Sequence, residues 1–450
     1  MTSVNSAAVR SVEPGVKIFL LGASVTLLAG VIATPVMASG SAETCRGLAA
    51  TITGTGTSPV VGTEGPDVIV ALGGGSVQAL GGDDVICLRS AGAFVVAGSG
   101  DDIVDATAAR GFTGVILGAG SDTFLGGPAD DQVWGAGNGS TSPGFDDVDT
   151  EPDTITTGRG TDLVSSGAAD SINHDQIATG PGADRVALSS QLAADGRLDV
   201  GSGANTVGIT LGAAGAWGVD VLERTITYDG EVTTWSGTIA DYAIGLAQES
   251  SPSTLSFDGS HADESLSVSG PLTANLHMRG GNDSISVSVQ LGAGSVYSLG
   301  PGRDALSLGS FDTDGGRFSL PSLSVDLDDH RADYGARGTS PGATVNGVED
   351  LHASAVHLRA AGTGKGDRIS AGGCVVDVDG RQGADRLIRL GIGYRHCATV
   401  RTRLFGGPGD DRLLGAKQTD DVLVGGAGRD VAVGGEGTDT CRAEVTRECE

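Results

Sequence analysis

Regularly spaced aspartates, each preceded by glycines, are the residues of this sequence with the clearest chemistry. Between Leu404 and Cys441 a nine-residue unit recurs: Gly, Gly, any residue, Gly, any residue, Asp, any residue, an apolar residue, any residue. A carboxylate and the backbone carbonyls of a tight loop supply the hard oxygen ligands that Ca²⁺ prefers. The unit therefore predicts calcium at the turns, with candidate carboxylates in this run at Asp411, Asp421, Asp430 and Asp439.

The remaining places of the unit indicate the elements that position these aspartates. The glycines allow positive φ and close backbone approach, and the pairs concerned are Gly406 and Gly407, Gly425 and Gly426, Gly434 and Gly435. The apolar residue at the eighth place lies on a very short strand and faces inward. Because one unit cannot bury that residue alone, the units must stack, and we expect an all-β solenoid.

The same pattern occurs in eroded form near the N-terminus. Asp67, Asp84 and Asp102 are 17 and 18 residues apart, close to twice the nine-residue period. The intervening units carry Ser58 and Ser76 in place of the acid. If two units make one coil, alternate units fall on opposite edges of the solenoid. Calcium in this section is then expected along one edge only.

Further units follow with less regular spacing. Two in direct succession place Asp122 and Asp131 on opposite edges. The segment from Gly135 to Asp153 is rich in Gly, Ser, Pro and Asp and predicts an excursion from the coil. The pattern then returns with acids at Asp162, Asp170 and Asp184.

The repeat is poor between Gly201 and about Ala360. Asn205 and Glu264 stand where Asp is expected, although Asp283 and Asp304 retain it. Apolar and polar residues alternate in parts of this stretch, which predicts strands. A coil that continues without most of its metal sites is one interpretation, and a separate small β domain is the other. The motif recovers at Asp367 and Asp385.

We therefore expect four sections: a signal peptide (1–38), an N-terminal calcium-binding repeat section (39–200), a divergent β-solenoid section (201–360) and a C-terminal calcium-binding repeat section with a cap (361–450). Arg10 and Lys17 precede an apolar run at 18–33, and small residues near Ala38 predict a cleavage site. The run of about 16 residues is short for a membrane span of ~20. An uncleaved anchor is the alternative, and no second hydrophobic run follows, so we expect a secreted chain with no membrane contact after cleavage.

Charge and cysteine content restrict the class of protein further. The formal net charge of −28 repels nucleic acid and anionic membranes and favours bound cations. High glycine content also fits a disordered chain, but the regular apolar residue after each Asp argues for a fold. Six cysteines in an exported chain favour disulfides. Sequence proximity suggests the pairs Cys45–Cys87, Cys374–Cys397 and Cys441–Cys449.

These motifs resemble the repeats-in-toxin, or haemolysin-type calcium-binding, family. The match is close over Leu404 to Cys441 and weaker over 62–186. The resemblance implies a right-handed parallel β-roll with Ca²⁺ held between glycine-rich turns, where the glycines at 406, 407, 425, 426, 434 and 435 offer backbone carbonyls. It implies calcium-binding carboxylates at Asp411, Asp430 and Asp439, and with less of the motif at Asp67, Asp84, Asp102, Asp122, Asp131 and Asp421. The chain looks like a stand-alone repeat protein, similar to short secreted actinobacterial members.

Two functions of different classes follow from the sequence. The first is a secreted, non-catalytic calcium-binding protein that folds on calcium binding outside the cell and acts in the cell envelope or in adhesion, with a cell-surface polysaccharide or protein as partner. The second is a polysaccharide-acting lyase or hydrolase with its site in the divergent section near Trp217 and Trp235. Aromatic residues lining a groove favour the enzyme, and aromatic residues buried in the coil favour the non-catalytic protein.

Overall fold

The computed structural model describes residues 43–89, 91–135, 149–168, 171–211, 214–246, 253–270, 272–288, 293–309, 311–312, 317–334, 342–391, 397–417 and 419–449. The expected signal peptide, Asp170 and most of the excursion after Gly135 lie outside these residues. Among the residues described there is no α-helix, and none therefore that is long and apolar enough to cross a bilayer.

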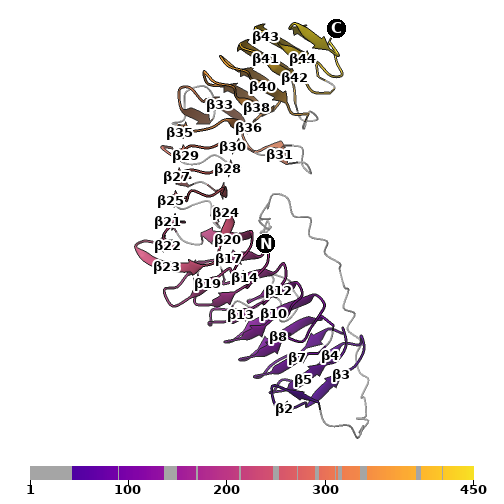
Figure 1. Ribbon diagram of the computed structural model, residues 1–450. Helices are drawn as coiled ribbons and strands as arrows, with labels where there is room; N and C mark the ends of the chain where they lie inside the picture. Colours follow the sequence, from indigo (N-terminus) through magenta and orange to yellow (C-terminus); the bar gives the residue numbers. More distant parts are fainter. Residues whose placement is uncertain are drawn as a thin grey trace, which may run out of the picture. The chain divides into compact units, whose positions relative to one another are not determined.

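Two long sheets face each other, and the chain alternates between them from strand to strand (Figure 1). The strands of the first, sheet I, are β4 (Val60–Val61), β6 (Val77–Gln78), β8 (Phe94–Ser99), β10 (Thr113–Ala119), β12 (Asp131–Trp134), β14 (Leu163–Ser166), β17 (Arg185–Leu188), β20 (Asn205–Leu211), β24 (Ile239–Leu246), β26 (Ser265–Ser269), β28 (Ser284–Val287), β30 (Ala305–Leu308), β36 (Asp350–Ser354), β38 (Arg368–Gly372), β40 (Arg386–Arg389), β42 (Arg412–Leu414), β44 (Val431–Val433) and β46 (Val445–Arg447).

Sheet II contains β3 (Ile52–Gly54), β5 (Val68–Ala71), β7 (Val85–Leu88), β9 (Ile103–Asp105), β11 (Thr123–Leu125), β13 (Thr154–Thr156), β16 (Gln176–Ala178), β19 (Arg197–Asp199), β21 (Ala216–Asp220), β22 (Thr225–Tyr228), β23 (Glu231–Ser236), β25 (Thr254–Asp258), β27 (Thr273–His277), β29 (Val296–Ser298), β33 (Ser322–Asp326), β34 (Arg331–Tyr334), β35 (Ala343–Asn346), β37 (His357–Ala361), β39 (Val375–Asp379), β41 (Arg401–Pro408), β43 (Asp421–Ala427) and β45 (Thr440–Arg442). Three short pairs lie outside the two sheets: β1 (Thr44–Cys45) with β2 (Leu48–Ala49), β15 (Ile172–Asn173) with β18 (Gln191–Leu192), and β31 (Phe311–Asp312) with β32 (Arg317–Phe318).

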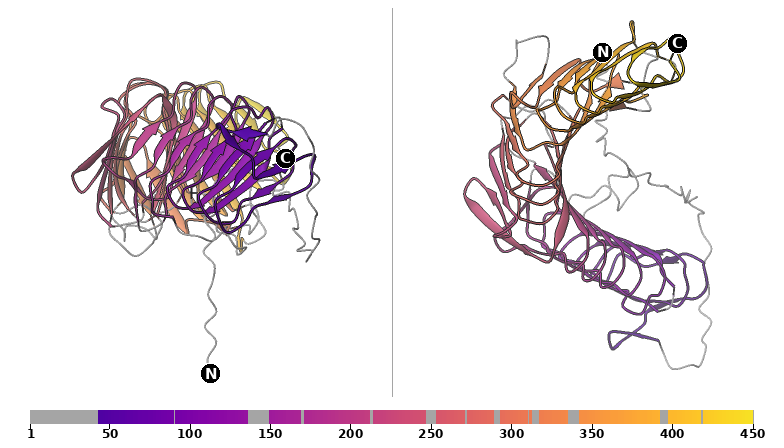
Figure 2. Two further views of the ribbon diagram at one scale, coloured as in Figure 1. Left: turned by 90° about the horizontal axis from the view of Figure 1, so that it is seen from below. Right: turned by 45° about the horizontal axis from the view of Figure 1, so that its top comes forward.

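The core is a single column of apolar side chains between the two sheets. The residue two places after each acid faces inward, as the nonamer predicts: Ile69, Val104, Phe124 and Leu413 are all fully buried. Successive strands of one sheet stack side by side along the coil (Figure 2). They pair in parallel and in register, for example Ile86 opposite Val104. The all-β parallel β-roll expected from the repeat is confirmed.

The divergent middle section continues the coil. Sheet I runs from β20 to β24, β26, β28 and β30 by parallel pairing without a break. Sheet II differs there, because two antiparallel meanders are inserted into it. Strands β23, β22 and β21 lie in that order between β19 and β25, and β35, β34 and β33 lie between β29 and β37. Each insertion gives sheet II two strands that have no counterpart in sheet I.

Three disulfides join the cysteines that sequence proximity pairs: Cys45–Cys87, Cys374–Cys397 and Cys441–Cys449. They close loops of very different length, with sequence separations of 42 for the first and 8 for the last. The first ties β1 to β7 at the N-terminal end of the coil, and the last closes the C-terminal end.

Loop length sets the expected cost of removing each bond. Replacing both Cys45 and Cys87 by serine should lower the free energy of unfolding of the N-terminal coils by about 4 kcal/mol, against about 2.5 kcal/mol for Cys441 and Cys449, because the longer loop gains more entropy in the unfolded chain. Urea unfolding of the two variants in millimolar calcium measures the difference. Equal losses would contradict the loop-entropy account.

Candidate metal centre

The acids of the repeat occupy the turns that lead into the strands, on two separate edges of the coil. On the edge that leads into sheet II, six acids stand directly before successive strands: Asp67, Asp84, Asp102, Asp122, Asp153 and Asp175. Asp131 opens β12 and lies on the other edge, which leads into sheet I. The expected separation of Asp122 and Asp131 onto opposite edges is confirmed.

Hydrogen bonds connect the acids of the sheet II edge into what we call a carboxylate ladder. The backbone N–H of each acid donates to a carboxylate oxygen of the acid in the next coil. The five N···O distances from Asp67 to Asp175 lie between 2.7 and 2.9 Å. Near the C-terminus the same bond joins Asp421 to Asp439, at 2.8 Å. One oxygen of each accepting carboxylate thereby forms the hydrogen bond of the ladder, and the other oxygen takes no part in it.

A second ladder follows the sheet I edge, and it extends well beyond the strong repeats. Its bonds, from 2.7 to 3.0 Å, connect Asp131, Asp162, Asp184 and Asn205, then Glu264, Asp283, Asp304 and Glu349, then Asp367, Asp385, Asp411, Asp430 and Glu444. The ladder is interrupted at β24 and between Glu349 and Asp367. The middle section thus keeps four acids on this edge, Glu264, Asp283, Asp304 and Glu349. The interpretation that the coil continues there without most of its metal sites stays a prediction.

Four ladder acids lie outside the nonamer pattern and were not anticipated from the sequence: Asp153, Asp175, Glu349 and Glu444. Asp153, Asp175 and Glu444 lack the preceding glycines, and Glu349 keeps one of them, Gly347. The signal at Asp153, Asp175 and Glu349 is an acid two places before the inward-facing residue of its strand, and these residues, Ile155, Ile177 and Leu351, are buried.

The second carboxylate oxygen of many ladder acids is buried and has no hydrogen-bond partner within the described part of the chain. This holds for Oδ2 of Asp84, Asp102, Asp122, Asp153, Asp184, Asp283, Asp304, Asp385, Asp411 and Asp430. An unpaired buried carboxylate oxygen costs free energy, more so when the group is charged. The cost is removed if a cation contacts the oxygen, so these atoms fit a hard metal ion such as Ca²⁺.

The first glycine of each turn makes space beside that oxygen. A Cβ on Gly406 would lie 2.2 Å from Asp411 Oδ2 and 2.5 Å from the carbonyl oxygen of Gly425 in the next coil. On Gly434 it would lie 2.4 Å from Asp439 Oδ2 and 2.2 Å from the carbonyl oxygen of Glu448. A carboxylate and a carbonyl oxygen thus converge beside a residue that must lack a side chain.

The second glycine of each turn is required for a different reason. Gly407, Gly426 and Gly435 have φ of 110°, 122° and 112°, a region that favours glycine. A Cβ on Gly426 would also lie 2.0 Å from the carbonyl oxygen of Gly407 in the preceding coil. Both glycine positions of the nonamer are therefore turn positions, as expected.

Side chains alone do not make a complete metal site. Within the described residues, no three His, Cys, Asp or Glu side chains gather closely enough to hold an ion. Ca²⁺ takes 6–8 oxygen ligands, so backbone carbonyls and water must supply the rest. This donor set is compatible with Ca²⁺ and unsuited to zinc or copper, which prefer nitrogen and sulfur.

Protein donors already satisfy some of the predicted ligands. Asp67 accepts hydrogen bonds from the hydroxyl of Thr51 and from the hydroxyl and backbone N–H of Thr63, at 2.8–2.9 Å. Burial raises the pKa of Asp67, but these hydrogen bonds outweigh it and lower the pKa overall. Asp421 Oδ2 likewise accepts from the N–H of Ala416 and the hydroxyl of Thr419, whereas its Oδ1 is buried and has no hydrogen-bond partner among the described residues. Both remain candidate ligands, but Asp67 has less need of a cation than Asp421.

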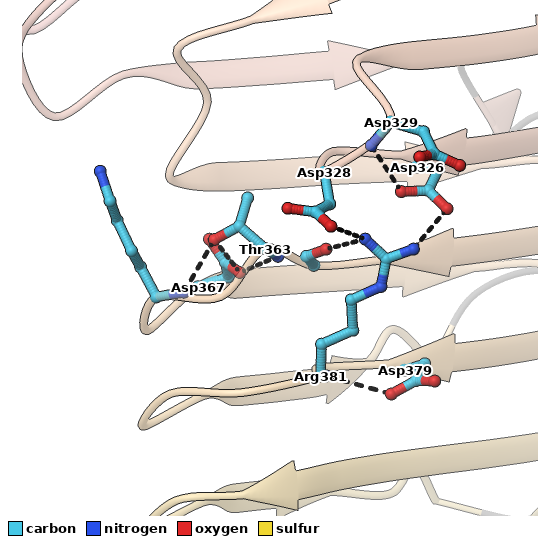
Figure 3. Close-up of polar contacts among 9 residues, drawn as sticks. Asp326, Asp328, Asp329, Thr363, Asp367, Asp379 and Arg381 are labelled. Carbon is cyan, nitrogen blue, oxygen red and sulfur yellow. Dashed lines mark hydrogen bonds and ion pairs between the residues drawn. The ribbon is translucent and has the colours of Figure 1, made fainter.

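A fixed positive charge occupies one turn of the C-terminal section (Figure 3). Arg381 stands at the second place of its unit, with φ of 69° where glycine is usual. Its guanidinium donates to Asp326 at 2.6 Å and to the carbonyl oxygen of Gly362 at 3.2 Å, and it pairs with Asp328 at 3.2 Å. Beside it, Asp367 accepts from the backbone N–H and hydroxyl of Thr363. This turn is stabilised by the chain itself.

Several ladder carboxyls of the sheet II edge have raised pKa values, in contrast to Asp67. Burial, the largest cause, raises the pKa of Asp84 to about 6, of Asp102 to about 8 and of Asp122 to about 7. Burial and then the neighbouring Asp175 carboxylate raise the pKa of Asp153 to about 10. On the sheet I edge burial raises the pKa of Asp131 and of Asp385 to about 7. Without a cation these groups resist ionisation.

The stability of the calcium-free protein should therefore fall as pH rises. The folded-state pKa of Asp84, Asp102 and Asp122 lies above the ordinary value of 3.8, so the folded chain binds more protons than the unfolded one in this range. Their contribution is fully present below about pH 4 and is lost as the pH passes through about 6 to 8. The circular dichroism signal of β structure, followed in a chelator from acidic to alkaline pH, measures this. A β signal that does not decrease as the pH rises would contradict it.

The first coils of the sheet I edge contain no acid in the ladder row. Strand register places Ser58, Gly75, Ala93 and Thr113 in the row that Asp131 opens. Gly75, rather than the expected Ser76, thus occupies the acid position. The acids of the N-terminal section thus lie on one edge as far as Asp122, and the expectation that calcium binds along that edge only stays a prediction.

A family model describes the same turns. The RTX calcium-binding nonapeptide repeat matches the chain in four copies, over residues 115–139, 403–420 and 416–444. No match to a curated protein was found. The matched repeats bind Ca²⁺, and they include Asp122, Asp131, Asp411, Asp421, Asp430 and Asp439.

Proposed function

The chain belongs to the RTX-type calcium-binding repeat proteins, and from this premise we propose that it is an extracellular, non-catalytic protein whose coil forms only when calcium binds. It is exported largely unfolded and orders in the calcium-rich exterior. Its setting is the cell envelope or an adhesive surface.

The observation that carries the proposal is the set of buried carboxylate oxygens without a partner. Adjacent coils are ~4.8 Å apart, so ionised acids of one ladder repel one another when no cation lies between them. The core is thin and poor in aromatic residues, which make up 4% of the chain. Burial of so small a core contributes too little free energy to offset both this repulsion and the loss of chain entropy on folding. Binding and folding are therefore one process.

Burial of the aromatic residues in the middle section favours the non-catalytic function over the polysaccharide-acting enzyme. Trp217 and Trp235 are only 4% and 6% exposed, and the buried Tyr242 ring lies between those of Trp235 and Phe257. They pack inside the coil, where they are inaccessible to a sugar chain. The ladder acids are accounted for by the turns of the coil and need no catalytic role.

The cysteines support an extracellular location. All six form disulfides, and such bonds persist in oxidising compartments. Extracellular calcium, in the millimolar range, matches the affinity of about 10⁻⁴ to 10⁻³ M typical of extracellular modules.

Calcium titration into the chelated chain tests the proposal. We expect the far-ultraviolet circular dichroism signal of β structure to appear cooperatively, with several ions bound per chain by equilibrium dialysis. Magnesium at the same concentration should not restore the signal, because it requires shorter, near-octahedral coordination. A chain that is already ordered in chelator, or that binds one ion or none, would disprove calcium-coupled folding.

A further inference from the structure

An open pocket of about 540 Å³ crosses three successive turns of the sheet I edge, close to the N-terminal end of the coil. Arg89, Thr107, Ala108, Ala109, Arg110 and Pro128 line it. Its volume lies within the range of about 300–1,000 Å³ found for sites of small ligands. Two of its six lining residues are arginines, in a chain whose net charge is −28.

The pocket lies where this edge has no carboxylate ladder. The two turns that contribute the arginines lead into β8 and β10, whose positions in the acid row are held by Ala93 and Thr113. An acid on these turns, Asp105, is paired with the Arg46 guanidinium at 3.4 Å and accepts the hydroxyl of Thr107 at 2.6 Å. An acid of the third turn, Asp130, accepts the N–H of Thr161 and does not line the pocket. The charged side chains that line the pocket are therefore Arg89 and Arg110.

The two arginines of the pocket differ in their contacts. The Arg89 guanidinium donates to the carbonyl oxygen of Thr44 at 2.6 Å, which fixes its position while leaving its other N–H groups for a ligand. Arg110 is exposed. Guanidinium groups bind carboxylate and sulfate oxygens through two parallel hydrogen bonds.

Exposed aromatic rings continue from the pocket onto the outer face of sheet I. Phe112, two residues after Arg110, is 57% exposed, and Phe94, five residues after Arg89, is 38% exposed. Both rings lie over Gly114, where a Cβ would be 2.9 Å from Phe94 and 3.6 Å from Phe112. Trp134, half-buried, follows with its ring centroid 6.4 Å from that of Phe94. The other two tryptophans, in the middle section, are buried.

We propose that this pocket and the adjoining rings bind an acidic polysaccharide, through a sugar unit that carries a carboxylate or a sulfate. The apolar face of a sugar ring packs on the aromatic rings, and its anionic group pairs with Arg110 and Arg89. The inference names a class of partner for the proposed role in the cell envelope. It rests on the proposed function only for that location.

Binding of defined oligosaccharides to the full chain in millimolar calcium tests the inference. The probes are a glucuronate-containing hyaluronan oligosaccharide, a sulfated chondroitin oligosaccharide of equal length and a neutral malto-oligosaccharide, followed by calorimetry. We expect at least one anionic probe to bind and the neutral one not to. Arg110→Gln should weaken binding roughly tenfold and Phe112→Ala roughly fivefold, which correspond to the loss of one charge-assisted contact and one stacking contact. Binding of both anionic probes points to the carboxylate that they share, and binding of the chondroitin probe alone points to its sulfate.

Matched variants at the other end of the coil serve as controls. Arg429→Gln removes an exposed arginine and Phe405→Ala an aromatic residue that is 40% exposed, and neither should alter binding. Circular dichroism in calcium verifies that each variant is folded. Absence of binding by both anionic probes, equal binding of the neutral probe, or binding insensitive to Arg110→Gln and Phe112→Ala would overturn the inference. A chain that binds the anionic probe but is ordered without calcium would instead contradict only the proposed function.

Discussion

Replacing Gly425 by alanine should abolish calcium binding at the turn of Asp430 and destabilise the C-terminal coils by about 3 kcal/mol. A Cβ on Gly425 would lie 2.3 Å from Asp430 Oδ2, 2.4 Å from its Cβ and 2.5 Å from its Cγ. Asp430 is fully buried and its Oδ1 accepts the N–H of Asp411, so it has no room to move aside. The φ of Gly425 is not in the left-handed region, and the effect therefore comes from lost space.

Calcium stoichiometry and the urea midpoint in calcium measure this effect, and Gly364→Ala is its matched control. Gly364 lies in the turn before Asp367, has no positive φ, and a Cβ there would meet nothing within 4 Å. We expect the control to keep the ion count and the midpoint of the unsubstituted chain. If Gly425→Ala behaved like the control, the space beside the first glycine would not be needed for the metal.

Replacing Asp102 by asparagine should have opposite effects with and without calcium. Burial raises the pKa of Asp102 to about 8, so above that pH the calcium-free coil must contain its buried charge. Asparagine keeps the oxygen that accepts the N–H of Asp84 and removes the charge. In chelator the variant should keep the β signal of the acid-stabilised coil to a higher pH than the parent, whereas its affinity for calcium at this turn should fall roughly tenfold.

The chain already contains such a substitution at the end of one ladder segment. Asn205 accepts the N–H of Asp184 at 2.8 Å, and its amide donates to the carbonyl oxygens of Val200 and Thr238 at 2.6 and 2.9 Å. The turn is satisfied by the protein alone, which is the state expected for Asp102→Asn.

Circular dichroism in chelator over a pH series, and calcium titration at neutral pH, measure the two effects. Glu223→Gln removes the same charge from an exposed position outside the ladders and should change neither the pH at which the β signal is lost nor the calcium affinity appreciably. If Asp102→Asn lost the β signal at a lower pH than the parent, Asp102 would serve the calcium-free fold and the account of its carboxylate would fail.

The nine-residue period by itself determined the fold and many of the acids. An inward-facing residue at the eighth place of each nine-residue unit requires a strand in that unit, and strands that short are stable only when stacked. The position of the acid, two places before that residue, then fixes it in the turn. This local geometry placed Asp84, Asp102 and Asp122 on one edge and Asp131 on the other. It also explains why Gly406 and Gly425 are glycines.

Tertiary structure decided the features that depend on register between coils. Asp153, Asp175 and Glu349 join the ladders although insertions destroy their spacing, because parallel pairing restores register after each insertion. The two antiparallel meanders of sheet II have no signature in the repeat.

Tertiary contacts also separate carboxylates that lack a partner, such as Asp102, from those that Thr51, Thr63 or Thr363 satisfy. The pocket of Arg89 and Arg110 belongs to the same class of feature, since it is assembled from three turns that are adjacent only in the folded coil. Local sequence sets the oxygen ligands and the space in each turn, whereas stacking of the coils sets which turns lie next to one another.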